Sequence, residues 1–228
     1  MPANPAIILV HGFWGGAAHW AKVIPLLHAA GLDSLHAVEL PLTSLADDAE
    51  RTRRMIAQAG GPVLLVGHSY GGAVITEAGT HPDVQGLVYI AAFAPDAGES
   101  AGGITQANPP EGAAAIAPDS DGYLWIAQDK YHDNFCQDLS AQEALVMAVT
   151  QKAPLGSTFG DTIGTPAWRS RDCWYQVSDH DRMIAPANQV MMSGRMNARK
   201  VIHLPASHAS LASQPGPVAD LIIEAARG

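Results

Sequence analysis

The amino-acid sequence predicts an α/β fold, in which a mainly parallel sheet carries helices on both faces. Short apolar runs rich in β-branched residues, typical of strands buried on both faces, recur along the chain. Between several of them lie segments whose apolar residues follow the spacing of an amphipathic helix. Strands that alternate with helices form a parallel sheet, because each helix carries the chain back to the edge from which the previous strand started.

The first four elements are predicted to alternate between strand and helix. Residues 6–10 (AIILV) predict a doubly buried strand, and a helix is expected over residues 17–30. The apolar side chains of this helix recur at i, i+3, i+4 and i+7: Trp20, Val23, Ile24 and Leu27. A weaker strand near residues 34–40 and a polar-faced helix over about residues 46–59 complete this part.

The same alternation continues through the next segment and returns at the C-terminal end. Residues 62–67 and 86–92 predict buried strands, with a helix over residues 69–79 between them. Strands are also predicted at residues 173–177 and 200–204. The helices predicted in the C-terminal part are 187–192 and a last one that carries Val218, Leu221, Ile222 and Ala225.

Between residues 93 and 168 the alternation stops. This stretch is too long for an ordinary loop, so we predict a helical cap or lid inserted into a single domain that spans residues 1–228. Its aromatic side chains could line a pocket or form the core of the cap itself. They are Phe93, Trp125, Tyr131, Phe135, Phe159 and Trp168.

Charge and cysteine content exclude several classes of partner and site. The formal net charge of −9 would repel a phosphate backbone, so we expect no nucleic-acid partner. Cys136 and Cys173 are too few for a disulfide framework, and neither they nor His180 and His203 have the spacing of a metal site. The first residues do not resemble a secretion signal, and no apolar run is long enough to cross a bilayer. We therefore expect a cytoplasmic protein without a membrane partner, metal or cofactor.

The pentapeptide GHSYG, residues 67–71, indicates a nucleophilic serine. It follows a predicted buried strand and precedes a predicted helix, and its two flanking glycines allow the tight turn that lifts the hydroxyl of Ser69 above the sheet. The start of the following helix would direct free N–H groups and its positive dipole end toward an oxyanion formed at this serine.

A serine is a poor nucleophile unless a base removes its proton and an acid orients that base. His208 lies just beyond the strand that ends at residue 204, and Asp181 lies just beyond the strand that ends near residue 177. Both should emerge at the same carboxyl edge of the sheet as Ser69. Asp179 is the main rival for the acid and Asp96 a weaker one, whereas His11 and His68 are predicted to be structural.

With these motifs the chain resembles the α/β-hydrolase superfamily, in which serine, acid and histidine follow one another in this order. The stretches HGFWGG, GHSYGG, FAPDAGES, DRMIAP and SHASLASQP are similar to those of small bacterial esterases of the salicylate-ester and pyrethroid-hydrolase type. They are also similar to the plant group of methyl-ester esterases and hydroxynitrile lyases. The resemblance implies about six mainly parallel strands, and its D-R-x-I-x-P match implies that Asp181 is the acid.

The resemblance also implies an oxyanion hole formed by the backbone N–H groups of Phe13 and Tyr70. The residues that we assign to a substrate pocket are Gly12, Trp14, Trp125, Tyr131 and Phe135. Because the cap is rich in aromatic residues and poor in cations, a neutral and fairly apolar ester is the expected substrate.

The function we expect is hydrolysis of a small carboxylic ester through an acyl-enzyme on Ser69. Hydroxynitrile lyase or lactonase activity at the same site is an alternative, as is a slow-turnover receptor of the same fold. The plant lyases of the group resemble this chain but carry threonine at the position of Gly12 and lysine at the position of Ala209, which favours an esterase here. The sequence leaves the oligomeric state, monomer or homodimer, open.

Overall fold

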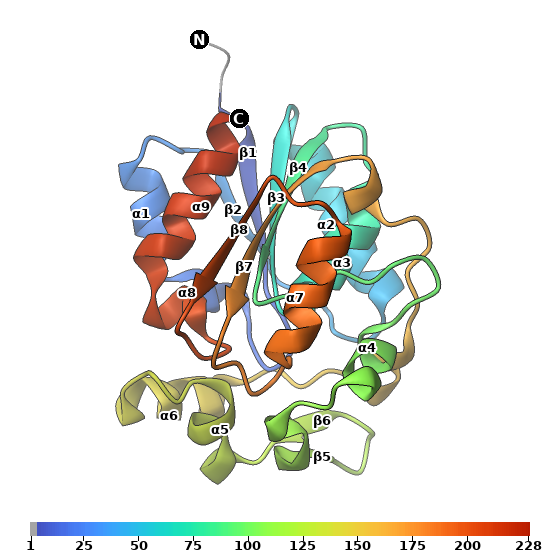
Figure 1. The fold of residues 1–228 in the computed structure, drawn as a ribbon, viewed down its shortest axis with the longest axis vertical. Coiled ribbons are helices and arrows are strands. Elements are labelled where there is room, and N and C mark those ends of the chain that lie inside the picture. The colour runs from blue at the N-terminus through green and yellow to red at the C-terminus, as the bar shows by residue number, and fades with distance from the viewer. Residues whose placement is uncertain (1–3) are drawn as a thin grey trace.

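A computed structural model describes residues 4–228, in which a six-stranded parallel sheet lies between two layers of helices (Figure 1). The strand order across the sheet is β2-β1-β3-β4-β7-β8, and every neighbouring pair is parallel. The strands are β1 (Ala6–Val10), β2 (Leu35–Val38), β3 (Val63–His68), β4 (Val84–Ile90), β7 (Asp172–Ser178) and β8 (Lys200–Leu204). The predicted fold class and the expected six strands are therefore confirmed.

The two helix layers cover opposite faces of the sheet because alternate strand residues point to opposite sides. In β1, Ile8 and Val10 belong to one apolar cluster, and Ile7 and Leu9 to the other. One face is covered by α2 (Leu45–Ala59), α3 (Gly71–Ala78) and α7 (Pro186–Arg195). The other is covered by η1 (Ala17–Trp20), α1 (Ile24–Ala29), α8 (Ser210–Ser213) and α9 (Pro215–Arg227). None of the helices within residues 4–228 has the length and apolar character needed to cross a membrane.

Two predicted elements differ from the structure. The helix expected over residues 17–30 is broken into the 3₁₀ turn η1 and the short α1, because Pro25 has no N–H and fits only the first turn of an α-helix. The strand expected over residues 86–92 lies two residues earlier. It ends at Ile90 because Ala91 takes a left-handed φ of +43°.

Most of the segment between β4 and β7, residues 91–171, lies across the carboxyl ends of the strands, and its last part runs back beside α3 (Figure 1). We call residues 91–171 the cap segment. Its α-helices are α4 (Ala101–Ala107), α5 (Gln128–Phe135) and α6 (Ala141–Thr150). Its 3₁₀ turns are η2 (Glu111–Ala115), η3 (Gly156–Gly160) and η4 (Ala167–Arg169). It also holds an antiparallel hairpin, β5 (Ile116–Pro118) and β6 (Leu124–Ile126), which the sequence did not predict because three residues show no strand periodicity.

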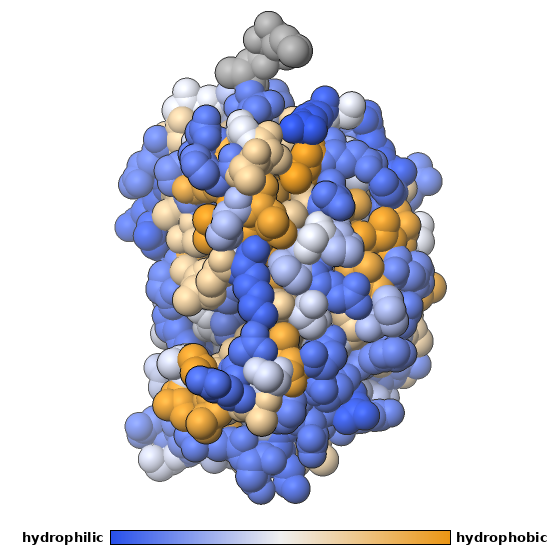
Figure 2. Space-filling model, turned by 90° about the vertical axis from the view of Figure 1, so that its left-hand side faces the viewer, coloured by the Kyte–Doolittle hydropathy of each residue, from blue (hydrophilic) through white to orange (hydrophobic). Residues whose placement is uncertain are grey.

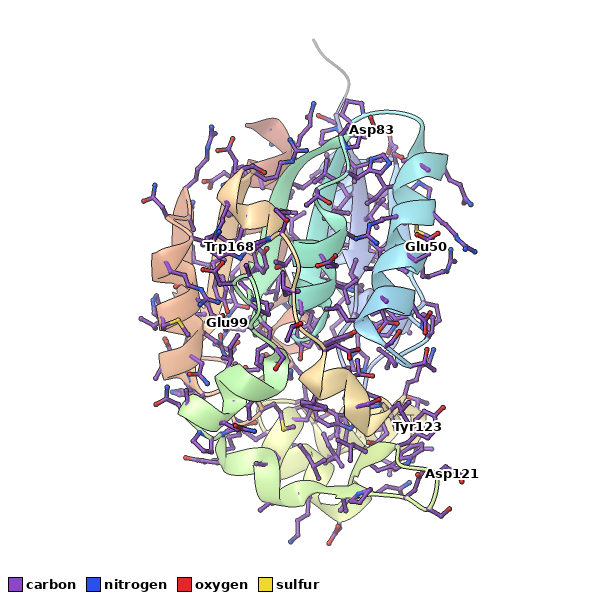
Figure 3. The ribbon with its side chains drawn as sticks, turned by 90° about the vertical axis from the view of Figure 1, so that its right-hand side faces the viewer. Glu50, Asp83, Glu99, Asp121, Tyr123 and Trp168 are labelled. Atoms are coloured by element: carbon purple, nitrogen blue, oxygen red, sulfur yellow. The ribbon has the colours of Figure 1, made fainter. Side chains whose placement is uncertain are left out.

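The cap segment forms one end of the molecule and leaves apolar side chains on its surface. Asp121 and Tyr123, at the hairpin, lie at the opposite end of the protein from Asp83 (Figure 3). On α6, Leu145, Val146 and Val149 are 62%, 57% and 60% exposed. Figure 2 shows apolar surface at this end of the molecule.

The approach of α3 to the sheet leaves no room for a side chain at two glycines of the GHSYG motif. A Cβ on Gly71 would lie 2.4 Å from the carbonyl oxygen of Val10, and one on Gly67 would lie 2.6 Å from the carbonyl oxygen of Gly71. Both contacts are with backbone, which cannot move aside as the end of a flexible side chain can. The helix can therefore start directly after the serine only if these two positions are glycine.

We expect Gly71→Ala to lower the free energy of unfolding by at least about 1–3 kcal/mol, because the new methyl group overpacks the contact with β1. Gly194→Ala is the matched control: Gly194 lies in α7 with no neighbouring atom within 4 Å of its Cβ position. Alanine there should raise the stability by about 0.5–1 kcal/mol. Urea unfolding followed by circular dichroism measures both changes, and equal stability of Gly71→Ala and the parent chain would contradict the argument.

Candidate active site

Ser69 stands in a strained turn at the carboxyl end of β3. Its φ is +56°, in the left-handed region that a residue with a Cβ rarely adopts. Its N–H donates to the carbonyl of Ile90 (3.2 Å), and its own carbonyl accepts from the N–H groups of Gly72 and Phe93 (both 3.0 Å). These three hydrogen bonds, together with the glycine contacts, hold a conformation that local preference alone would not select.

Asp181 and His208 lie against one another at the same edge of the sheet. The Nδ1 of His208 is 2.7 Å from Oδ2 of Asp181, and both side chains are buried. A carboxylate oxygen accepts hydrogen bonds, so Nδ1 carries the hydrogen and Nε2 keeps its lone pair. Within the described residues this buried Nε2 has no hydrogen-bond partner. The imidazole is therefore fixed in the tautomer that can accept a proton.

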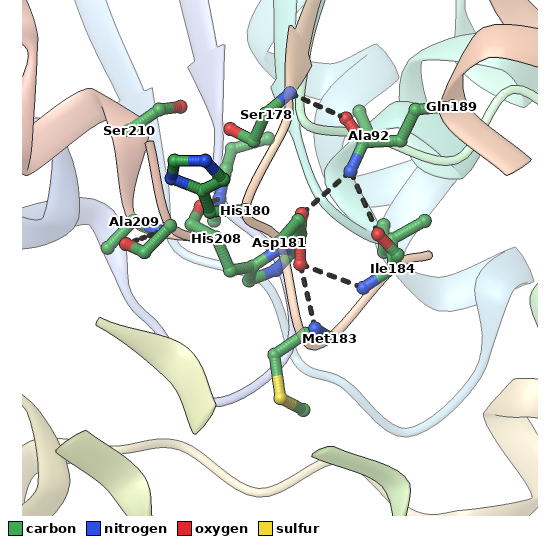
Figure 4. A network of polar contacts seen from close by, with 12 residues as sticks. Ala92, Ser178, His180, Asp181, Met183, Ile184, Gln189, His208, Ala209 and Ser210 are labelled. Carbon is green, nitrogen blue, oxygen red and sulfur yellow. Dashed lines mark hydrogen bonds and ion pairs between the residues drawn. The ribbon is translucent and has the colours of Figure 1, made fainter. Parts of the chain in front are cut away.

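Three further donors hold the Asp181 carboxylate (Figure 4). Its Oδ1 accepts from the backbone N–H groups of Met183 (2.7 Å) and Ile184 (2.9 Å), and its Oδ2 accepts from Nε2 of Gln189 (2.8 Å). The Oε1 of Gln189 accepts from the N–H of Ser178 (3.0 Å). Gln189 thus connects the carboxylate to the end of β7. Sequence reasoning missed this residue, although a glutamine on the buried side of α7 is a signal that could have pointed to it.

The other acidic and histidine candidates lie elsewhere. Asp179 accepts from Nδ1 of His203 (2.8 Å), and both side chains are exposed. Asp96 pairs with Arg169 at 2.5 Å in the cap segment. Among residues 4–228, no group of three His, Cys, Asp or Glu side chains could hold a metal ion. Of the acidic residues considered from the sequence, the structure brings Asp181 alone against His208.

His68 and His11 are buried and bonded to backbone. The Nε2 of His68 donates to the carbonyl of His208 (2.8 Å), which fixes the loop that carries that histidine. The Nδ1 of His11 donates to the carbonyl of Gly12 (2.8 Å), and its Nε2 accepts from the N–H of Leu40 (3.0 Å). Burial lowers the pKa of both imidazoles, that of His68 well below its usual range. Both histidines are therefore neutral at neutral pH.

The two residues predicted to form the oxyanion hole are Phe13, in the loop after β1, and Tyr70, directly after Ser69. Within the described residues, neither backbone N–H donates a hydrogen bond to a protein acceptor. The rings of the two residues stack, with centroids 3.9 Å apart and an interplanar angle of 13°. Gly12, just before Phe13, comes so close to Ser69 that a Cβ on it would lie 2.4 Å from the Cβ of the serine.

Trp14 ties this loop to the cap segment. Its φ is +57°, and its N–H and indole Nε1 donate to the carbonyls of Lys152 (2.9 Å) and Leu124 (2.8 Å). Its own carbonyl accepts from the hydroxyl of Tyr131 (3.0 Å). Three hydrogen bonds thus join the loop after β1 to three separate parts of the cap segment.

The aromatic residues predicted for a pocket divide into two sets. Tyr131 and Phe135 stack at 4.8 Å, and the ring of Phe135 lies edge-on to His208 at 4.9 Å. Phe159 packs on Phe13 at 4.6 Å. Trp125, in contrast, is 40% exposed on the hairpin, with its Nε1 bonded to Asp119 (2.8 Å).

Trp168 lies apart from this aromatic group as well. Its Nε1 donates to the carbonyl of Pro95 (2.9 Å), and the guanidinium groups of Arg169 and Arg195 approach its ring. Phe135 is therefore the aromatic residue of the cap segment that lies against His208, with Tyr131 stacked behind it, while Phe159 packs with Phe13 and Trp14.

The known proteins to which this chain is similar include hydrolases and esterases. The chain is similar to the alpha/beta hydrolase nvfD of Aspergillus novofumigatus, at 28% identity over 98% of this chain and 97% of that protein. A carbendazim hydrolyzing esterase of Nocardioides is 31% identical over 62% of each chain. The crystal structure of a pyrethroid hydrolase from Sphingobium faniae has the same fold, with a TM-score of 0.83, 24% identity and coverage of 99% and 98%.

A polyneuridine aldehyde esterase also shares the fold, with a TM-score of 0.83, 20% identity and coverage of 98% and 99%. The family model described as alpha/beta hydrolase family matches residues 7–221. With this match, the parallel sheet and the serine turn at its carboxyl edge, the chain belongs to the alpha/beta hydrolase family.

Proposed function

We propose that this protein is a serine carboxylic-ester hydrolase that forms an acyl-enzyme on Ser69. The observation that carries the proposal is the His208 imidazole, whose Nδ1 is bonded to Asp181 and whose buried Nε2 has no partner within the described residues. It lies at the sheet edge where the strained turn presents Ser69. The esterases among the relatives support the same chemistry.

In the acylation step, Nε2 of His208 takes the proton of Ser69 and the serine oxygen attacks the ester carbonyl. The negative charge that forms on the carbonyl oxygen is stabilised by the N–H groups of Phe13 and Tyr70, which are free to donate. Asp181 holds the imidazole in the productive tautomer and stabilises its protonated form. His208 then gives the proton to the leaving alcohol.

In the deacylation step, His208 removes a proton from water, and the hydroxide attacks the acyl group on Ser69. The same two N–H groups receive the second oxyanion. Collapse of this intermediate releases the carboxylic acid and returns the proton from His208 to the serine oxygen. No cofactor enters either step.

The aromatic lining supports a small, neutral and fairly apolar ester as substrate. The ring of Phe135 lies against His208, and Phe13, Trp14 and Phe159 pack together in and against the loop that carries one of the proposed oxyanion donors, so the surroundings favour apolar acyl or alcohol groups. The name of one relative, a pyrethroid hydrolase, points the same way.

The surroundings of Gly12 argue against hydroxynitrile lyase chemistry. A threonine here, as in the plant lyases that the sequence resembles, would bring its Cβ to 2.4 Å from the Cβ of Ser69 and to 2.9 Å from the carbonyl oxygen of His68. The latter contact is with backbone, so the turn itself would have to shift. Cyanide release from a cyanohydrin would nevertheless overturn the assignment to esterases.

We expect Ser69→Ala to lower kcat on a nitrophenyl ester by more than about 10⁴-fold while the chain stays folded. A fluorophosphonate should label the parent chain once, on the peptide that contains Ser69. Ser193→Ala is the control, because this serine is buried in α7 and its hydroxyl, among residues 4–228, is bonded only to the Val190 carbonyl. Full turnover by Ser69→Ala would disprove the nucleophile. Retention of a ligand without repeated turnover by the parent chain would indicate a receptor.

We expect His208→Gln to lower kcat by about 10³-fold or more, whereas His68→Gln should change it by less than about tenfold. His68 should instead affect acid stability. Its pKa is lowered in the folded chain and returns to about 6.5 on unfolding, so the unfolded chain binds more protons below that pH and stability falls as pH drops.

Between pH 6.5 and 5.5, His68 alone should remove about 1 kcal/mol from the free energy of unfolding, and glutamine, which does not titrate, should remove this part of the slope. Urea unfolding of His68→Gln and of the parent chain is measured at pH 8, 6.5 and 5.5. A loss of packing would lower the stability of the variant at pH 8 as well, whereas the titration of His68 changes stability only at the lower pH values. An unchanged pH slope would show that His68 is not neutral in the folded chain.

A further inference from the structure

A fully buried carboxylate lies on the inner side of α2, at a position where the helix otherwise buries small and apolar residues. The buried residues of this helix are Leu45, Asp48, Ala49, Thr52 and Ile56. Asp48 is 0% exposed, yet its carboxylate does not cap its own helix, because the Ser44 side chain already accepts from the N–H of Asp47 (3.0 Å). The carboxylate oxygens of Asp48 point instead to two groups outside the helix.

One of these groups is the hydroxyl of Tyr70. It donates to Oδ2 of Asp48 at 2.8 Å, while the ring of Tyr70 stacks on Phe13. Tyr70 is thereby held at its far end by a hydrogen bond and along its ring by the stack. The backbone N–H groups of Tyr70 and Phe13 are the two donors assigned above to the oxyanion hole. The stacked rings of these two residues therefore link the two donors.

The other group is the backbone N–H of Leu42, which donates to Oδ1 of Asp48 at 2.8 Å. Leu42 takes a left-handed φ of +63°, and its carbonyl accepts from the N–H of Leu155 in the cap segment (2.9 Å). A left-handed leucine is strained, and the Asp48 bond is one of the contacts that hold it. The carboxylate therefore joins α2, the cap segment and the turn that carries Ser69.

We propose that Asp48 is a positioning residue for the oxyanion hole: through the Tyr70 hydroxyl it holds the Tyr70 ring on Phe13, and so fixes the two backbone N–H groups relative to one another. The inference rests on the proposed function, because it assigns a task to residues that act only if an oxyanion forms at Ser69.

Electrostatics agree with this role. Burial raises the pKa of Asp48 to about 6, although the bonds from Leu42 and Tyr70 and the charge of Lys152 oppose this shift. Burial and the neighbouring Asp48 charge raise the pKa of the Tyr70 phenol, which therefore remains a donor. A buried carboxylate of this kind costs stability compared with a well-packed apolar pair.

The test compares Tyr70→Phe and Asp48→Asn with the parent chain. Tyr70→Phe keeps the ring and the backbone N–H and removes only the bond to Asp48; Asp48→Asn keeps the shape of the side chain and removes its charge. The readouts are kcat and KM on a nitrophenyl ester and the inhibition constant of a trifluoromethyl ketone. That inhibitor forms a tetrahedral adduct whose oxyanion occupies the hole.

We expect each variant to lower kcat by about tenfold and to raise the inhibition constant by about tenfold. Complete loss of one donor would lower kcat by roughly a hundredfold or more, and these variants only misplace the donors. KM should stay within about twofold, because the ground-state carbonyl gains less from the hole. The double variant should be no worse than the more impaired single variant, since both substitutions act on the same contact between Asp48 and Tyr70.

Two controls separate positioning from folding. Tyr89→Phe removes another buried hydroxyl, bonded to Thr76 of α3 at 2.9 Å, and Asp47→Asn changes the exposed carboxylate next to Asp48. Neither should change kcat or the inhibition constant, although Tyr89→Phe should lower the unfolding midpoint. If Tyr70→Phe and Asp48→Asn lower only that midpoint, Asp48 is structural and the inference fails. If the parent chain neither turns over esters nor reacts with fluorophosphonate, the proposed function is wrong. The inference about Asp48 then fails as well.

Discussion

The strand-to-helix turn at Ser69 is the constraint on which the rest of the site depends. A left-handed serine between β3 and α3 is stable only because three backbone hydrogen bonds hold it and glycines let α3 approach β1. Because β3 lies near the middle of a parallel sheet, the loops that follow its neighbours β1 and β4 reach the same edge, and those after β7 and β8 complete it. The fold therefore gathers residues from distant parts of the sequence around one hydroxyl.

Burial and complete hydrogen bonding set the chemistry of that edge. Asp181 accepts from two backbone N–H groups, Gln189 and His208, so its side chain cannot turn away from the imidazole. His11 and His68 are neutral and bonded to backbone, whereas His208 is the buried histidine whose Nδ1 is hydrogen-bonded to a carboxylate and whose Nε2 has no partner among the described residues. Because these side chains are buried, each remaining donor or acceptor interacts more strongly with a charge than it would in solvent.

The cap segment contributes to the site through backbone contacts as well as through aromatic rings. Trp14 and Leu42, both with left-handed φ, bond to Lys152 and Leu155 of the cap segment. These contacts fix the loops after β1 and β2 against one another, and Asp48 connects the second of them to Tyr70. A change in the cap segment can therefore alter the geometry around Ser69 without touching the serine.

The sequence alone determined the fold class and the alternation of strands and helices along the chain, because buried strands and helical spacing are local patterns. It also predicted Ser69 and His208 as candidate catalytic residues, but it left Asp179 as a rival to Asp181, which only the family resemblance favoured. It could not place the break at Pro25 within a regular apolar pattern, nor the β5–β6 hairpin, whose strands are too short to show a period. Gln189 and Asp48 were missed for a related reason: a polar residue on a buried helix face shows that it needs a partner but not which one.

Only the tertiary structure decided that Asp181 rather than Asp179 meets His208, that Trp125 lies on the surface, and that Asp48 bonds to Tyr70. Each of these depends on which distant segments pack together, and no local pattern contains that information.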